Sequence, residues 1–530
     1  MKTIMKKFLF LVFITAVCYL NTIGQTTYSK VYNIINGNEY GSLIKMFGGT
    51  QFILGDGICD PLTPNLVPCG FFLMINETEN QYKTVVFGDN RLSFASHNAF
   101  AMSNDTFYIF AADFRTIDND FVVYKTNLAG DSLGVLIYHP EFQSIYPESI
   151  MVKDDYIFLY GSVKKNQNKT NIIVIKMDKK GNFIKSTQFA EVLSEKSNFP
   201  KPMIETADGY LAIMSQYNDS DNKYPSVIKF DTDLNLVWHL PLPKTNKIFQ
   251  RSDFPYMTPT NDGGMVISYQ MSLADSIRYH PEKWDQFTTW AQVILKIDQN
   301  ANMLWQDTMF TTTFPGQYFS SPWRGVKHLS TLENGDVLCI GDWNCFECDP
   351  ENMGWLARYS SDGQLKWEHI YNDLTWGQGG YGSYFLSVDE AENGDLVCTG
   401  DIEGSGGEWN NSHYTWVLRL DSLGCFTPGC DTDSFSEVFT VQSEEVRINL
   451  SSDLLVYPNP SDDFLHLVLP EDMDADQLLV LNSTGQVVMK MDGSYEKIEV
   501  SHLPAGLYVI IVTDTGKKLT ARTRFIKTDR

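Results

Sequence analysis

Six ionisable side chains have the chemistry of general acids or bases, and all of them lie in segments of variable length. They are Asp342, Asp349, Glu403, Glu408, His280 and His413. Paired carboxylates, or a carboxylate with an imidazole, move protons in hydrolases and lyases. No fixed spacing connects any two of these residues, and carboxylates in so acidic a chain are usually solvated. The sequence therefore assigns no catalytic residue, and we expect no enzymatic activity.

The familiar motifs for phosphates, cofactors and catalytic metals do not occur in the sequence. It has no phosphate loop, no HExxH and no GxSxG. GQGGYG at Gly377 matches GxGxxG, but no helical pattern follows it, which argues against a dinucleotide site. Asp431–Glu437 is a weak calcium candidate without the twelve-residue EF-hand loop, and DTDLN at Asp231 is better explained as a turn. We therefore assign no cofactor and no metal.

Charge and the N-terminal pattern restrict the partners and the compartment. The 530 residues carry 41 Lys and Arg against 65 Asp and Glu, a net charge of −24, which argues against nucleic acid as a partner. Three lysines precede an apolar run over 8–20, and small residues follow it before Gln25. This pattern predicts a signal peptide over 1–24, with a retained anchor as the alternative. The run is too short to span a bilayer, so we expect export and no membrane span.

Eight of the nine cysteines remain once Cys18 leaves with the signal peptide, and an even number permits disulfides in an exported chain. Cys339 and Cys398 occupy the same position in two copies of a repeat, so we expect two buried free thiols. CFEC at Cys345 lacks the second Cys or His pair of a zinc site, and a disulfide is the preferred interpretation. The predicted pairs are Cys59–Cys69, Cys345–Cys348 and Cys425–Cys430.

Two short β patterns alternate along most of the chain. The first is an Asp, Asn or Gly turn followed by an apolar strand, as in ENGDVLCIGD and ENGDLVCTGD. The second is strand, turn, strand, as in VIKFDTDLNLVW and ILKIDQNANMLW. The residue before the second turn recurs seven times, 51 to 67 residues apart, at Asn76, Asn127, Asp178, Asp231, Asp298, Ser360 and Asp421. Seven β-only units of this length predict an all-β fold, a seven-bladed β-propeller over residues 25–430.

The last repeat lacks its fourth strand, because GCFTPGC follows its third. Near the N-terminus the β-like run Tyr28–Ile35 has no partner within its own repeat. We expect this run to complete the last blade and so to cover the sheet edge. In such a meander the stereotyped turns lie together at one end of the blades, and the variable connections lie at the other.

Aromatic residues concentrate in the variable connections of the later blades. Long loops on a rigid scaffold commonly build binding surfaces, and aromatic faces beside acids and amides suit sugar rings or a polypeptide. The alternative is that these rings only pack the loops onto the propeller rim. The candidate ligand-binding residues are Trp284, Trp290, Trp323, Trp343, Trp376, Tyr381 and Trp409.

A second composition starts near residue 454, after an acidic stretch over 431–453 that we interpret as a linker. Short β runs end at Gly, Pro or Asn turns, which predicts a small C-terminal β-sandwich over 454–530. This stretch resembles the type A C-terminal sorting domain of the type IX secretion system of Bacteroidetes. The motif residues are Tyr457, Pro458, Asn459, Pro460, Gly485, Pro504, Gly506, Tyr508 and Lys527.

This resemblance implies a destination and partners. Proteins with such a domain pass from the periplasm through the outer membrane, and a cell-surface sortase usually removes the domain. The implied partners are the type IX secretion machinery and that sortase, and the expected location is the outer-membrane surface or the medium. The cut is expected within 431–453.

The expected function is that of a secreted or cell-surface β-propeller binding protein, a monomer, whose ligand is a glycan or a protein. The alternative is a secreted hydrolase or lyase that acts on glycan or protein at the propeller loop face. A third possibility is an adhesion or structural component without a small ligand.

Overall fold

The computed structural model describes most of the chain downstream of residue 26. The described residues are 27–34, 39–60, 67–76, 81–87, 92–94, 99–113, 120–139, 143–166, 169–189, 199–219, 222–242, 256–279, 286–311, 323–344, 352–373, 382–404, 412–427, 430, 436–441, 444–447, 454–469, 473–482, 486–493, 495–516 and 519–528. These segments form strands and turns and contain no helix, which confirms the predicted all-β class. None of them therefore supplies a helix able to cross a membrane.

Seven sheets precede the C-terminal domain, and the first five of them are each built from consecutive strands. Sheet 1 holds β2 (Glu39–Phe47), β3 (Thr50–Asp60), β4 (Val67–Asn76) and β5 (Gln81–Phe87); sheet 2 holds β6 (Leu92–Phe94), β7 (Phe100–Ser103), β8 (Thr106–Asp113), β9 (Asp120–Asn127) and β10 (Ser132–Tyr138). Sheet 3 holds β11 (Gln143–Lys153), β12 (Tyr156–Asn166), β13 (Lys169–Asp178) and β14 (Phe183–Gln188); sheet 4 holds β15 (Phe199–Glu205), β16 (Leu211–Asp219), β17 (Asn222–Phe230) and β18 (Leu236–Pro241). Sheet 5 holds β19 (Tyr256–Pro259), β20 (Met265–Tyr279), β21 (Gln286–Ile297) and β22 (Met303–Thr311).

Sheets 6 and 7 each contain a strand from a distant part of the sequence. Sheet 6 holds β23 (Trp323–Thr331), β24 (Val337–Asn344), β25 (Asn352–Tyr359), β26 (Leu365–Asp373) and β30 (Ser436–Val441). Sheet 7 holds β27 (Ser383–Glu390), β28 (Leu396–Gly404), β29 (Ser412–Leu420), β1 (Tyr28–Asn33) and β31 (Glu444–Arg447).

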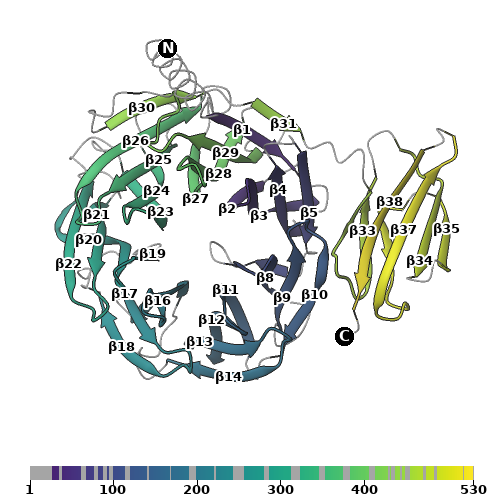
Figure 1. The fold of residues 1–530 in the computed structure, drawn as a ribbon, viewed down its shortest axis with the longest axis horizontal. Helices are drawn as coiled ribbons and strands as arrows, with labels where there is room; N and C mark the ends of the chain where they lie inside the picture. The colour runs from purple at the N-terminus through teal and green to yellow at the C-terminus, as the bar shows by residue number, and fades with distance from the viewer. Residues whose placement is uncertain are drawn as a thin grey trace, which may run out of the picture.

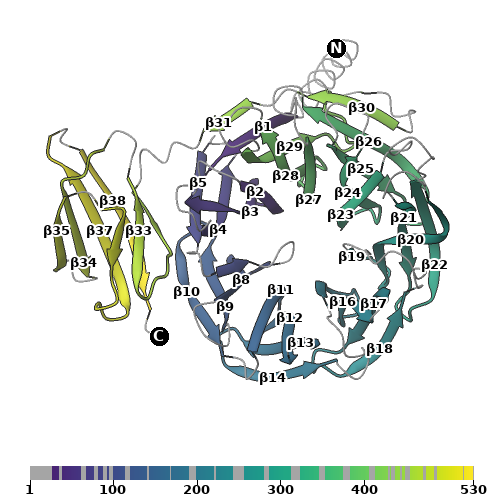
Figure 2. The same ribbon diagram turned by 180° about the vertical axis from the view of Figure 1, so that it is seen from behind.

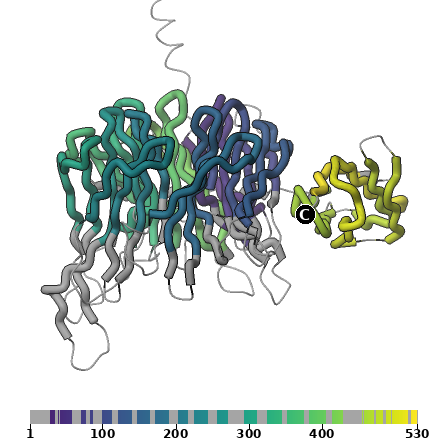
Figure 3. Tube along the Cα trace, turned by 90° about the horizontal axis from the view of Figure 1, so that it is seen from below, coloured from purple at the N-terminus to yellow at the C-terminus, as the bar shows by residue number. Residues whose placement is uncertain are grey.

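These sheets stand around a common centre in a propeller-like arrangement, seen from its two sides in Figures 1 and 2. The first strands, such as β2, β11, β19 and β27, lie nearest the centre, and β5, β10, β14, β18 and β22 lie at the rim. Seen from the side, the sheets together form a thick disc, with the C-terminal domain beside it (Figure 3).

The turn between the third and fourth strands is held by a side chain that caps it. In sheet 3 the Asp178 carboxylate accepts hydrogen bonds from the backbone N–H of Lys180 and Asn182 at 2.9 and 2.8 Å, and from the Asn182 amide at 2.7 Å. Asp231 and Asp298 repeat the same three contacts one and two sheets later. The Asn182 amide holds the pKa of Asp178 below its ordinary value. These carboxylates are committed to local structure.

Apolar side chains fill the spaces between neighbouring sheets. One cluster joins sheets 6 and 7 through Leu356, Phe385 and Trp416, all fully buried. Another joins sheet 7 to sheet 1 and includes Tyr32 of β1 and Phe71 of β4. Each large side chain buried in this way contributes about 1.5–3 kcal/mol. The core is therefore distributed around the ring between the sheets.

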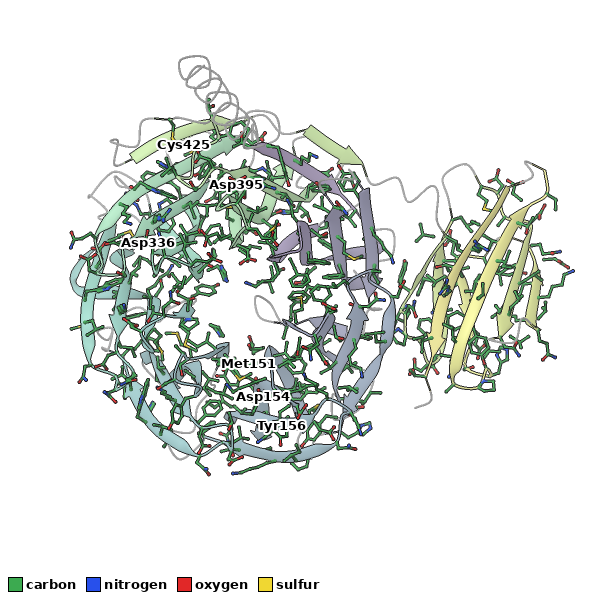
Figure 4. The ribbon with its side chains drawn as sticks, in the orientation of Figure 1. Met151, Asp154, Tyr156, Asp336, Asp395 and Cys425 are labelled. Atoms are coloured by element: carbon green, nitrogen blue, oxygen red, sulfur yellow. A yellow bond between two sulfur atoms is a disulfide. The ribbon has the colours of Figure 1, made fainter. Side chains whose placement is uncertain are left out.

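A basic residue two positions before the capping residue ties each later sheet to the next one. Lys229 Nζ contacts Asp208 of its own sheet at 2.7 Å and donates to the Gln299 carbonyl of sheet 5 at 3.2 Å. Equivalent contacts connect sheet 5 to sheet 6 and sheet 6 to sheet 7. They are Lys296 with Asp262 and the Ser361 carbonyl, and Arg358 with Asp336 and the Ser422 carbonyl. In sheet 7, Arg419 Nε donates to Asp395 at 2.9 Å. Asp336 and Asp395 are marked in Figure 4.

The N-terminal strand β1 occupies the fourth position of sheet 7. It pairs antiparallel with β29, with Tyr28 opposite Arg419 and Tyr32 opposite Thr415. The Trp416 indole donates to the Ser29 hydroxyl at 2.9 Å, which fixes the register through a side chain as well. Sequence-distant strands therefore meet where the repeats end.

The acidic stretch after Cys430 differs from the linker that its composition favoured. Within it, β30 pairs parallel with β26, and β31 pairs parallel with β1. These strands obtain their partners from elements far away in the sequence, which local composition does not reveal.

The cysteines follow the prediction wherever their side chains are described. Cys425 and Cys430 form a disulfide, and Cys339 and Cys398 are buried free thiols whose burial raises their pKa. Cys59 and Cys69 lie on the paired strands β3 and β4, with their side chains outside the described residues. Cys345 and Cys348, like the signal segment 1–24, also lie outside them.

The C-terminal domain has two sheets around a core of its own. One contains β32 (Leu455–Tyr457), β33 (Phe464–Val468) and β36 (Lys497–Glu499). The other contains β34 (Gln477–Asn482), β35 (Val487–Asp492), β37 (Gly506–Asp514) and β38 (Leu519–Lys527). Leu465, Val480 and Ile510 are among the fully buried residues between them.

We expect Asp395→Ala to destabilise the fold by about 3 kcal/mol, because it leaves the buried Arg419 guanidinium without its carboxylate. Lys83→Ala, which removes an exposed ion pair to Asp131, is the control and costs less than about 1 kcal/mol. Urea unfolding followed by tryptophan fluorescence measures both. Equal effects of the two substitutions would contradict the structural role given to the buried pair.

Candidate functional site

Three buried or half-buried carboxylates occupy the same register position in neighbouring sheets. They are Asp56 on β3, Asp342 on β24 and Asp401 on β28, and each follows a glycine. In every case the innermost strand carries a β-bulge beside the Gly–Asp pair. A Cβ at Gly400 would lie 2.1 Å from the Tyr384 carbonyl oxygen, so this close approach requires glycine.

The three carboxylates have different neighbours. Asp56 accepts a hydrogen bond from Ser42 at 3.3 Å, and burial raises its pKa to about 7. Asp342 lies 3.8 Å from Lys327 Nζ, and burial raises its pKa too, although Lys327 opposes that shift. Carboxyl groups shifted in this direction hold protons at higher pH than ordinary aspartates do, and perturbed carboxyl groups are characteristic of functional sites.

Asp401 forms a carboxylate–imidazole pair with His413. Its Oδ2 lies 2.7 Å from His413 Nδ1, on the adjacent strand β29. The Asp401 side chain is 2% exposed and the His413 side chain 33%, so the carboxylate orients a ring that reaches solvent. The hydrogen bond to Asp401 and the charges of Asp401 and Glu403 raise the pKa of His413, while burial opposes this. The arrangement suits ligand hydrogen bonding or proton transfer through Nε2.

Sheet 6 carries a second polar cluster built from all four of its consecutive strands. Arg324 on β23 makes a two-point contact with Glu368 on β26, at 2.8 and 2.7 Å. The Trp355 indole also donates to Glu368, at 3.2 Å. The Arg324 guanidinium lies over the Trp343 ring, 4.5 Å from its centroid. Trp343 is thus a half-buried platform with a fixed cation on one face.

Acidic residues also lie near the inner strands of sheets 3 and 5. Burial raises the pKa of Tyr256 on β19, and the charges of Asp342 and Glu148 add to that shift. Glu148 is the bulged residue of β11, in sheet 3. Even so, no group of three or more His, Cys, Asp or Glu among the described residues is arranged to hold a metal ion.

The structure changes the setting of the candidates taken from the sequence. Trp290, Trp323 and Trp343 belong to strands β21, β23 and β24, because the hairpins continue further than their polar sequences suggested. Asp342, Glu403 and His413 also lie on strands. Of the tryptophan side chains among these candidates, that of Trp343 is described. Trp284, Trp376, Tyr381 and Trp409 lie outside the described residues, as do Asp349, Glu408 and His280.

Sequence reasoning missed the residues that hold these candidates in place. His413 and Trp343 were predicted candidates, but Asp401, which pairs with His413, and Arg324, which stacks on Trp343, were not. A signal for Asp401 was present: the Gly–Asp pair recurs at one position in the first, sixth and seventh repeats. Arg324 had no such repeated pattern, and its orientation depends on Glu368, which lies on β26, three strands away from β23.

The motif residues of the C-terminal domain hold its own strands together. The Asn459 amide donates to the Arg524 carbonyl at 3.1 Å, and its carbonyl accepts from the Ile526 N–H at 2.9 Å. The Tyr508 hydroxyl donates to the Pro504 carbonyl at 2.7 Å. Tyr457 stacks on His466 and packs against the cluster between sheets 7 and 1. Gly506 opens β37 and the buried Lys527 closes β38, whereas Gly485 lies outside the described residues.

Residues 455–527 match the family model described as the secretion system C-terminal sorting domain. This part of the chain is a type IX secretion sorting domain. It directs the protein through the type IX system to the cell surface or the extracellular space. The sorting domain occupies the C-terminal end of the sequence, and the seven sheets precede it.

Comparisons of the whole chain find similarity at low identity. One similar structure is that of PorZ, an essential bacterial surface component of the type IX secretion system of Porphyromonas gingivalis. It is 13% identical with a TM-score of 0.38, and the alignment covers 92% of this chain and 59% of PorZ. The polysaccharide lyase Uly1 is 12% identical with a TM-score of 0.44, covering 76% of this chain and 93% of Uly1. The phage phi92 endosialidase is 9% identical with a TM-score of 0.39, covering 95% and 87%. No functionally curated protein matches the chain.

We expect Asp56→Asn to make the protein progressively more stable than the wild type as pH rises from 5 to 8. Because burial raises the pKa of Asp56 in the fold, the wild type loses stability as pH climbs from about 4 through 7. The neutral amide removes this loss, on the order of 2 kcal/mol at pH 8 for a partly exposed group. Urea unfolding at pH 5, 6.5 and 8 measures the difference, and a pH-independent offset would contradict it.

Proposed function

We propose that the secreted chain is a closed seven-bladed β-propeller that acts as a binding protein at the cell surface or in the medium. Its ligand is a glycan or a protein, held at the end of sheets 6 and 7 that carries Arg324, Trp343, Asp401 and His413. The pairing of β1 with β29 supports closure, because the N-terminal strand then supplies the last sheet with its fourth member.

The observation that carries this proposal is the Asp401–His413 pair. A buried carboxylate fixes the ring, and a third of the His413 side chain is exposed. Such a preorganised donor binds a polar ligand with little further ordering. The opposite end of the sheets offers less, because its turn carboxylates already accept backbone and amide hydrogen bonds.

The aromatic cluster of sheet 6 adds a recognition element beside this donor. One face of Trp343 is covered by Arg324, and Glu368 holds that guanidinium at two points. Fixed guanidinium groups bind carboxylates and hydroxyl groups of ligands, and aromatic rings stack on sugar rings. A polyhydroxylated or acidic glycan therefore fits this pair of clusters, and so does a polypeptide with similar groups.

We expect His413→Ala to weaken ligand binding about 10-fold or more, since a hydrogen bond to a charged group contributes about 1.5–3 kcal/mol. The chain without residues 1–24 is screened on glycan and extracellular-protein arrays, and hits are titrated. His139→Ala is the matched control, because His139 pairs with Asp120 at 2.8 Å in sheet 2, outside sheets 6 and 7 that carry the proposed site.

The pH dependence of the same titration gives an independent test. If imidazolium is the donor, affinity falls as pH rises through the pKa of His413, which lies above its ordinary 6.5. Equal affinities of the His413 and His139 variants would move the site away from this face. Trp343→Ala tests the aromatic cluster in the same titration.

A secreted hydrolase or lyase acting on glycan or protein is the second candidate, and the Asp401–His413 pair also favours it. A carboxylate-oriented imidazole with a raised pKa is a usable general acid or base. In that case we expect His413→Ala to lower kcat on a polysaccharide or protein substrate by about 100-fold or more with little change in KM. Turnover that survives unchanged in His413→Ala would remove the pair from any catalytic role.

A further inference from the structure

The segment between the Cys425–Cys430 disulfide and the sorting domain adds one strand to each of two neighbouring sheets. β30 runs parallel to β26, with Glu368 beside Ser436 and Asp373 beside Val441. β31 runs parallel to β1, with Lys30 beside Glu444 and Asn33 beside Arg447. Figure 1 shows β30 and β31 outside β26 and β1. We propose that β30 and β31 together form a strap that belongs to the secreted cargo and locks its N-terminal strand in place.

The burial of β26 supports the strap. The rim strands β14, β18 and β22 expose large apolar residues, namely Phe183 at 51%, Leu236 at 48% and Met303 at 63%. By contrast, β26 buries every residue from Trp367 to Tyr371. An outermost strand would not bury residues on both of its faces, so β26 has the composition of an interior strand.

Two neighbours cover β26. The Tyr371 hydroxyl donates to the Gly424 carbonyl at 2.7 Å, and the Trp367 ring abuts Gly424, so the turn after β29 covers its side chains. The disulfide Cys425–Cys430 follows this turn directly in the sequence. β30 then pairs with the backbone edge of β26 over six residues. The side chains of β26 are thus covered by the turn after β29, and its backbone edge is covered by β30.

The position of β1 explains why the strap matters for stability. A strand that is paired along one edge opens more readily than a strand paired along both, because half of its backbone groups face solvent. With β29 on one side and β31 on the other, β1 pairs along both edges. Val31 and Tyr32 are fully buried, and they contribute to the clusters on the two faces of sheet 7. Losing β31 would expose one edge of β1 and loosen both clusters.

The strap also constrains processing. It lies upstream of the sorting domain, which begins at residue 455. A cut that removes the sorting domain and leaves the cargo stable must therefore fall after Arg447. A cut at the start of the acidic stretch would remove β30 and β31 together.

Hydrogen exchange with mass spectrometry on the chain without residues 1–24 tests the strap directly. We expect backbone amides of 436–441 and 444–447 to exchange at least about 10-fold more slowly than in an unstructured peptide. Exchange at the unstructured rate in both segments would overturn the proposal.

Two truncated chains test the dependence of β1 on the strap. The chain that ends at Arg447 should keep the protection of Tyr28–Asn33, and the chain that ends at Cys430 should lose about 10-fold or more of it. If the shorter chain fails to fold while the longer one folds, the strap is still supported. If both chains protect β1 equally, the proposal is wrong.

A cross-link in the otherwise intact chain keeps the proposal testable if neither truncation folds. Lys30 and Glu444 are directly paired, and strands in a sheet lie about 4.8 Å apart, within reach of a disulfide. We expect Lys30→Cys with Glu444→Cys to form a disulfide under mild oxidation, shown by peptide mass. Lys30→Cys with Ser436→Cys, which is paired with Glu368 instead, is the control. Failure of the first pair, or equal yields in both, would overturn the proposed register.

Discussion

The arrangement of the later sheets depends on a basic side chain that contacts two turns at once. Lys229, Lys296 and Arg358 each pair with a carboxylate of their own sheet and donate to a carbonyl in the next sheet's turn. Burying a charge is unfavourable unless it is paired and hydrogen-bonded, so the two contacts are satisfied together or the geometry fails. Because each basic side chain must reach both partners, these contacts fix the distance between neighbouring sheets and the position of the side chain within its own sheet.

This arrangement divides the sheets into two chemically different ends. At one end, the carboxylates of Asp178, Asp231 and Asp298 accept the hydrogen bonds of their turns. The basic residues described above contact neighbouring sheets at the same end. Toward the other end Asp342 and Asp401 retain raised pKa values, and Asp401 supports the exposed ring of His413. The residues that hold neighbouring sheets together are therefore separate from the residues of the candidate site.

In the sorting domain, by contrast, the motif residues are also the residues that hold the strands together. Asn459 connects the first motif to the last strand through both of its amide atoms. Tyr508 and Phe525 stack with ring centroids 5.3 Å apart, inside the domain core. A sequence signature of this kind is recognisable because packing restricts each position. The signature indicates where the protein is exported, and the preceding sheets form the part that is exported.

Sequence by itself determined the features that rest on local pattern. The turn residues, the alternation of apolar positions and the sorting motifs predicted an all-β chain with an export domain, and the two equivalent cysteines indicated buried thiols. The missing fourth strand of the last repeat pointed to residues near Tyr28, because a meander leaves a recognisable vacancy.

Tertiary structure decided which distant residues meet. Asp401 with His413 is a diagonal contact between adjacent strands, Arg324 lies opposite Trp343 on the next strand, and its contact with Glu368 reaches from β23 to β26. The acidic stretch over 431–453 carries no periodicity that marks β30 and β31, since their partners β26 and β1 lie far away in sequence. Strand pairing is satisfied by backbone groups that every residue has, so composition alone could not reveal it.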